Sequence, residues 1–180
     1  CILADCSLFE RVSASERRGR LVLQGLDGGR DGGVYGLSCH PGAPHVAVCG
    51  LSGFLHVWNY KTQKLLLNKF YDKMHPAVLQ YSPCGKSLAI GFSNGLVKVL
   101  RSNDLSEIAS WRDKRASVSH IAWSPNSDYL AIALAEGSIT GAQGGAAGSN
   151  RCICLYKYAK RHEDDDEPEW QFSGNHRAHT

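Results

Sequence analysis

The sequence lacks several features that would assign it to a common functional class. No apolar run approaches the roughly 18 residues that a membrane-spanning helix requires. No basic segment precedes an apolar run at the start, as it would in a signal peptide. No two cysteines have the C-x-x-C spacing of a zinc knuckle or a redox pair. We therefore expect no membrane association, no metal site and no cofactor.

Charge of one sign is also scarce, because the net charge is only +3 over 180 residues. The basic residues are not interleaved with aromatic residues in a stripe, so nucleic acid is not an expected partner. The seven cysteines are an odd number, and several lie in apolar runs where a reduced thiol acts as a small hydrophobe. This usage indicates a reducing, intracellular compartment. The chain also lacks an initiator methionine, which suggests that it is an internal piece of a longer protein.

What the sequence does contain is a spacing of 42 residues that occurs twice. It separates three prolines and three glycines, namely Pro41, Pro83, Pro125, Gly53, Gly95 and Gly137. Similar segments surround these markers, such as those ending in His40-Pro41, Ser82-Pro83 and Ser124-Pro125. A fixed period of this length indicates one supersecondary unit that is copied and stacked.

Each copy predicts four short strands. An apolar run ends at the proline, and a turn leads to a second strand at 45–49, 87–91 or 129–133. A glycine-containing hairpin turn then leads to a third strand at 54–60, 96–100 or 151–156. A fourth strand follows at 64–68, 107–111 or 169–172. Four antiparallel strands in every 42 residues are typical of a β-propeller blade.

The predicted fold is therefore all-β, a partial propeller of about three blades with flanking strands. We place the blades at residues 33–72, 73–114 and 115–174. Residues 1–32 are expected to hold the end of a preceding blade and a linker, and residues 175–180 the start of a further blade. Two insertions interrupt the third blade: a Gly/Ala-rich loop at 138–150 and an acidic stretch from Glu163 to Glu169. We expect both to be solvated loops on the rim.

The repeats resemble those of the WD40 family. Trp58-Asn59 stands where that family has a Trp-Asp dipeptide at the end of the third strand, and His75 lies 25 residues before Leu100, as the family's Gly-His does. The dipeptide is replaced by Leu100-Arg101 in the second copy, and no complete Gly-His pair occurs. We therefore expect these blades to depend more on apolar packing than on a buried His-Asp network.

Motifs that would indicate catalysis have simpler explanations. Gly91 to Gly95 matches G-x-S-x-G, but that motif needs a strand-turn-helix context, and Ser93 lies in a predicted hairpin. The Gly-rich insertion lacks the Gly-Lys-Ser/Thr of a phosphate-binding loop. The run Asp164–Asp166 lacks the alternating ligands that wrap a calcium ion. We predict that the protein is not an enzyme.

Aromatic and histidine residues are expected to pack between blades or lie on the rim. Trp58, Trp111, Trp123 and Trp170 are explained by blade-to-blade packing, although an exposed tryptophan would instead anchor a partner. His40, His45, His56 and His120 are dispersed over different strands and do not form an obvious ligand set.

A closer resemblance covers residues 33–180, from Val34-Tyr35-Gly36-Leu37 through Ala89–Gly95 to Ser119–Ala131. These segments, in this order, resemble WD-repeat proteins of motile cilia, nearest the WD-repeat subunit of the calmodulin- and radial-spoke-associated complex. The resemblance implies a scaffold of the axoneme that links radial spokes to doublet microtubules and dynein regulation. Its expected partners are radial-spoke proteins, a calmodulin-containing complex and the doublet microtubule. The alternative is a generic cytoplasmic WD40 adaptor in trafficking or ubiquitin-ligase assembly.

Overall fold

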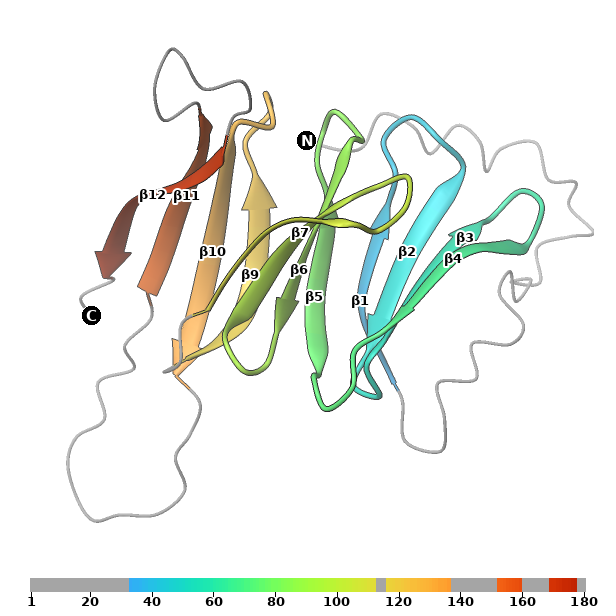
Figure 1. Cartoon of the computed structure of the whole chain (residues 1–180), viewed down its shortest axis with the longest axis horizontal. Coiled ribbons are helices and arrows are strands. Elements are labelled where there is room, and N and C mark those ends of the chain that lie inside the picture. The colour runs from blue at the N-terminus through green and yellow to red at the C-terminus, as the bar shows by residue number, and fades with distance from the viewer. Residues whose placement is uncertain (1–32, 113–115, 137–151, 160–168, 178–180) are drawn as a thin grey trace, which may run out of the picture.

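The structure is a computed structural model that describes residues 33–112, 116–136, 152–159 and 169–177. In these ranges the regular structure consists of β-strands, which form three four-stranded antiparallel sheets. The sheets stand side by side as three successive layers (Figure 1). No helix long and apolar enough to cross a bilayer is present in the described segments. The prediction of an all-β architecture of four-stranded units is confirmed.

Each sheet is formed by consecutive strands. Sheet one contains β1 (Val34–Cys39), β2 (His45–Gly50), β3 (Phe54–Asn59) and β4 (Lys64–Phe70). Sheet two contains β5 (Pro76–Tyr81), β6 (Ser87–Phe92), β7 (Leu96–Arg101) and β8 (Glu107–Arg112). Sheet three contains β9 (Ala116–Trp123), β10 (Tyr129–Glu136), β11 (Cys152–Ala159) and β12 (Glu169–Arg177).

β12 is longer than the sequence predicted. The expected fourth strand ends at residue 172, but β12 continues to Arg177 because the start of β11 needs a partner. Cys152 of β11 pairs with Arg177, and Leu155 pairs with Gly174. The expected blade boundary after residue 174 therefore falls inside this strand. Residues 1–32 and 178–180 lie outside the described part of the chain.

The 42-residue period extends to the irregularities of the sheets. The first strand of each sheet has one unpaired residue opposite the second strand, namely Tyr35, Ala77 and Ser119. These bulges are 42 residues apart. The fourth strands of sheets one and two also bulge at equivalent positions, Leu66 and Ile108. A bulge increases the local twist of a strand. The first strands of the three sheets are therefore twisted at equivalent positions.

The core lies between the sheets, and β6 shows why its residues are small and apolar. Leu88, Ile90 and Phe92 are fully buried in a cluster that they share with sheet one. Ala89, on the opposite face of the strand, belongs to the cluster shared with sheet three. A strand buried on both faces has no solvent-exposed side to supply polar residues. Sheet two is therefore held from both sides by apolar packing.

The spacing markers lie in turns and in one strand. Pro41, Pro83 and Pro125 follow the first strand of each sheet, in the turn that leads to the second. Gly53 and Gly95 lie in the turns between the second and third strands, with φ angles of 94° and 80°. Trp58 lies on β3, is 9% exposed and packs with Val46, Val48 and Phe54. Gly137 lies outside the described residues, and the role of these positions as blade markers stays a prediction.

Candidate interaction groove

The G-x-S-x-G match is explained by the packing and turn needs of its glycines. Gly91 has no room for a side chain, because a Cβ there would lie 2.4 Å from Cγ1 of Val118 on sheet three. Gly95 supplies the positive φ of the β6–β7 turn. Ser93 is an exposed residue of that turn, and its N–H donates to the carbonyl of His75. This is a strand-turn-strand context rather than a nucleophile elbow.

Histidines take part in contacts between neighbouring strands and sheets. The ring of His75 hydrogen-bonds through Nδ1 to the carbonyl oxygen of Leu51, at 2.5 Å. His56 lies on β3 between Phe54 and Trp58, with ring centroids 4.9 and 6.4 Å away, and burial lowers its pKa. His120 is exposed on β9. Across the described ranges, no three His, Cys, Asp or Glu residues are grouped so as to hold a metal ion.

A groove of about 620 Å³ opens between sheets two and three. It lies at the end of the sheets where the β5–β6, β7–β8 and β9–β10 turns meet. Its apolar lining comes from Ile108, Trp123 and Trp170, all partly buried. Its polar lining comes from the three turns and the strand ends beside them, namely Ser82, Cys84, Lys86, Ser87, Arg101, Ser102, Asn103, Asn126, Ser127 and Asp128.

The equivalent place between sheets one and two holds the side chain of His40. Its ring packs edge-on against Tyr81, with centroids 5.1 Å apart. Its Nδ1 accepts hydrogen bonds from the N–H groups of Gly42 and Ala43, so Nε2 carries the proton and donates to the carbonyl of Gly85 at 3.0 Å. Tyr81 is consequently only 5% exposed.

One exchange between repeats contributes to the opening of the groove. In the 42-residue register, Ser82 corresponds to His40, and Trp123 corresponds to Tyr81. The Ser82 hydroxyl is too short to reach across, and it accepts the N–H of Ser87 within its own turn at 3.1 Å. Ser82 therefore supplies no ring to pack on Trp123 as His40 packs on Tyr81, and the space that His40 fills in the first interface remains open in the second.

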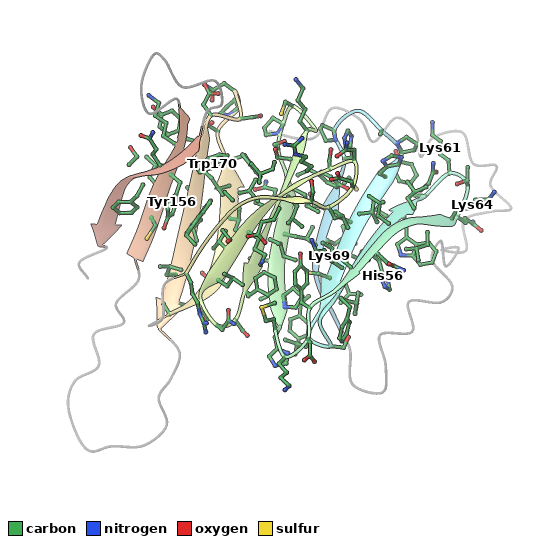
Figure 2. The ribbon with its side chains drawn as sticks, in the orientation of Figure 1. His56, Lys61, Lys64, Lys69, Tyr156 and Trp170 are labelled. Atoms are coloured by element: carbon green, nitrogen blue, oxygen red, sulfur yellow. The ribbon has the colours of Figure 1, made fainter. Side chains whose placement is uncertain are left out.

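The aromatic wall of the groove is held firmly. Trp123 Nε1 donates to the carbonyl of Gln80 on sheet two at 3.1 Å. Trp170 packs edge-on against Trp123 at 5.5 Å and lies 6.2 Å from Trp111. Trp111 stacks on Tyr156 at 4.3 Å, and Figure 2 shows Tyr156 and Trp170 close together on sheet three. These tryptophans pack between sheets, as expected, and two of them also line the groove.

Positive charge predominates at the polar side of the groove. Lys86 and Arg101 are exposed, and neither forms an ion pair in the described part of the chain. The ion pair found there joins Lys98 and Glu107. The carboxylate in the lining, Asp128, accepts a hydrogen bond from the Asn126 amide at 2.7 Å. Two cations therefore face solvent at the groove, with no carboxylate of the described residues within 4 Å of them.

Asp104 is the other carboxylate of the β7–β8 turn, and it is held by its own backbone. Its side chain accepts the N–H of Ser106 at 2.9 Å. That hydrogen bond is the main cause that lowers the pKa of Asp104, and the charge of Arg101 contributes less. Asp104 thus lies near enough to Arg101 for their charges to attract each other.

A thiol lies at the edge of the groove. Cys84 is exposed, and its Sγ lies 3.3 Å from the Ser82 hydroxyl. Its N–H donates to the hydroxyl of Ser127 on sheet three. Partial burial by itself would raise the pKa of this thiol, but hydrogen bonds from Ser82, Ser127 and the backbone outweigh it and lower the pKa. Cys84 is therefore an accessible thiol at the edge of the groove.

Sequence reasoning did not single out Cys84, Lys86 or Arg101. The turn 83–86 was visible, but nothing in it identifies a site. The available signal was the exchange of His40 for Ser82 between otherwise similar repeats. That exchange becomes meaningful only when the partner of His40, in the next blade, is known.

Comparisons with known proteins agree with the propeller architecture. Residues 21–59 match the profile of the WD domain, G-beta repeat, and residues 45–126 match that of the anaphase-promoting complex subunit 4 WD40 domain. The crystal structure of Saccharomyces cerevisiae Sqt1 superposes with a TM-score of 0.63 at 12% identity, covering 82% of this chain and 36% of that one. The fold is a partial WD40-type β-propeller.

The chain is also similar in sequence to cilia- and flagella-associated protein 251. Identity to the Pongo abelii protein is 33% over 133 residues, which is 72% of this chain and 11% of that protein. Identity to the Chlamydomonas reinhardtii protein is 28% over 171 residues, 95% of this chain and 18% of that protein. Echinoderm microtubule-associated protein-like 2 of Rattus norvegicus is 24% identical over 99 residues, 55% of this chain and 15% of that protein. The chain thus spans less than a fifth of these relatives.

Proposed function

We propose that this chain is part of a non-catalytic WD40 scaffold of the ciliary axoneme, at the base of a radial spoke. In this role it links the spoke to the doublet microtubule and to dynein regulation. Its partners are radial-spoke proteins, a calmodulin-containing complex and the doublet microtubule. The observation that carries the proposal is the similarity to cilia- and flagella-associated protein 251 along 95% of the chain.

The structure supports a binding role in physical terms. Its three sheets share apolar interfaces that are buried on both faces of sheet two, and such packing holds the connecting turns in fixed positions. The groove between sheets two and three presents side chains from three turns on this rigid frame. Binding residues are commonly carried on loops that a rigid scaffold positions.

Fractionation of cilia tests this proposal. The intact protein should stay with demembranated axonemes and leave them only under conditions that extract spoke-base proteins. An antibody or an epitope tag would follow it through detergent, salt and stronger chaotropic washes. Its absence from both the washed axonemes and their extracts would exclude the axonemal role.

A second candidate is a generic cytoplasmic WD40 adaptor of another multi-subunit complex. The observation in its favour is the match of residues 45–126 to the WD40 domain of an anaphase-promoting complex subunit. The same antibody or tag, followed in the cell bodies left after the cilia are removed, separates the two candidates, because an adaptor of this kind would be recovered in the soluble cytoplasm.

A further inference from the structure

We propose that the groove between sheets two and three binds an extended acidic peptide segment of a partner protein. An apolar side chain of that segment packs against Trp123 and Trp170, and its neighbouring carboxylates pair with Lys86 and Arg101. The inference rests on the protein-binding role proposed above, and it is independent of the ciliary location.

The size of the groove fits one anchoring side chain and the backbone beside it. Its volume of about 620 Å³ falls within the roughly 300–1,000 Å³ of ligand pockets in proteins. It is open at the ends of the sheets, so a segment can enter without a movement of the strands.

The aromatic wall favours an apolar anchor. Ile108, Trp123 and Trp170 are partly buried and line the same space. The contact of Trp123 with Gln80 and the edge-on packing of Trp170 fix both rings before any ligand binds. A fixed aromatic surface loses little side-chain entropy on binding, which is typical of residues that contribute most to an interface.

The charged side chains of the groove determine which charge is favoured in the peptide residues that flank the apolar anchor. Lys86 lies in the β5–β6 turn and Arg101 is the last residue of β7, and both line the groove without an ion pair in the described ranges. Arg101 can bind a carboxylate through two parallel hydrogen bonds. The lining holds these two cations against one carboxylate, Asp128, so acidic residues of a partner are favoured over basic ones.

The groove is not a general consequence of two blades meeting. Between sheets one and two, His40 fills the equivalent space and bonds to Gly85. In the second interface the residue at the same repeat position is Ser82. Of the two interfaces between the described sheets, only the first has this position filled by a ring.

Fluorescence anisotropy with the full chain tests the proposal. The probe is a labelled peptide with one phenylalanine flanked on each side by two glutamates. We expect Lys86→Glu and Arg101→Glu each to weaken its binding by about ten-fold or more, because each reverses a charge at the carboxylates. Lys61→Glu makes the same charge change on the exposed β3–β4 turn of sheet one (Figure 2) and should leave the affinity within about two-fold. Peptides with lysine for glutamate, or serine for phenylalanine, should bind at least ten-fold more weakly.

Protection of a thiol in the unaltered chain gives a second readout that does not depend on how variants fold. The bound peptide should slow maleimide modification of Cys84 and leave that of Cys39, an exposed cysteine of β1, unchanged. The proposal is overturned if the peptide does not bind, if Lys86→Glu and Lys61→Glu bind it equally, or if Cys84 stays unprotected at saturation. Absence of the protein from cilia would overturn the proposed function and leave this result in place.

Discussion

At the residue scale, the need for glycine at a tight turn can be measured. Gly53 has a φ of 94°, and a Cβ there would lie 2.3 Å from the carbonyl oxygen of Tyr71. We expect Gly53→Ala to lower the free energy of unfolding by about 2 kcal/mol or more, through backbone strain and this clash. Gly42 is the matched control, since a Cβ there meets nothing within 4 Å. Urea denaturation should show Gly42→Ala within about 0.5 kcal/mol of the unaltered chain, and equal losses in both variants would contradict the account.

Two cysteines of similar chemistry should differ strongly in reactivity. Burial raises the pKa of the Cys49 thiol to about 12, and that thiol lies inside the core between sheets one and two. Partial burial alone would raise the pKa of Cys84, but its hydrogen bonds outweigh this effect and lower the pKa. Its side chain is exposed. Because the thiolate is the reactive form, iodoacetamide at pH 8 should alkylate Cys84 well before Cys49. Mass spectrometry of the native protein measures the alkylation rate at each cysteine. Comparable rates at both positions would contradict the expectation, because they would show that the core between sheets one and two opens readily.

At the element scale, Lys69 joins the edge strand of sheet one to a turn of sheet two. Its Nζ donates to the carbonyl of Leu105 at 2.7 Å and lies 5.8 Å from the Tyr71 ring centroid. Lys69→Met keeps the apolar stem and removes the donor, so we expect a loss of about 1–2 kcal/mol. Lys64→Met, on the same strand but exposed, should cost almost nothing. Thermal melts compare the two, and an unchanged melting temperature for Lys69→Met would show that this contact does not hold the sheets together.

The strands were largely predictable, and their irregularities were not. The proline and glycine spacing located the strands of sheets one and two within a few residues, because tight turns need those residue types. Nothing in the residues themselves distinguishes Tyr35, Ala77 and Ser119 as bulges, since bulging depends on how two strands pair. The extension of β12 to Arg177 was missed for the same reason, because it is set by the start of β11.

The groove was beyond prediction from the sequence. It depends on the distance from Ser82 to a ring in the next sheet, and the same repeat position holds a histidine that fills the gap one blade earlier. Trp111, Trp123 and Trp170 pack between sheets two and three, as predicted, whereas Trp58 packs within sheet one against Val46, Val48 and Phe54. That Trp123 and Trp170 also line an open space depends in part on the short side chain of Ser82.

At the scale of the whole molecule, the two outer sheets carry exposed apolar residues. Sheet one exposes Leu37 by 61% and Phe70 by 67%, and sheet three exposes Ile153 and Phe172. Sheet two, which lies between them, keeps its large apolar side chains covered on both faces. A repeat unit of this kind buries its apolar faces by stacking on neighbouring units. We therefore predict that further blades pack beside the outer sheets.

The central claim, that this chain is a structural part of the axoneme, is tested most directly by cross-linking mass spectrometry on intact isolated axonemes. Lys61, Lys64 and Lys86 are exposed and can react with an amine-specific cross-linker. We expect cross-links from these lysines to radial-spoke proteins, to subunits of the calmodulin-containing complex or to doublet-microtubule tubulin. If spoke proteins cross-link to one another in the same sample while none cross-links to this chain, the claim is contradicted.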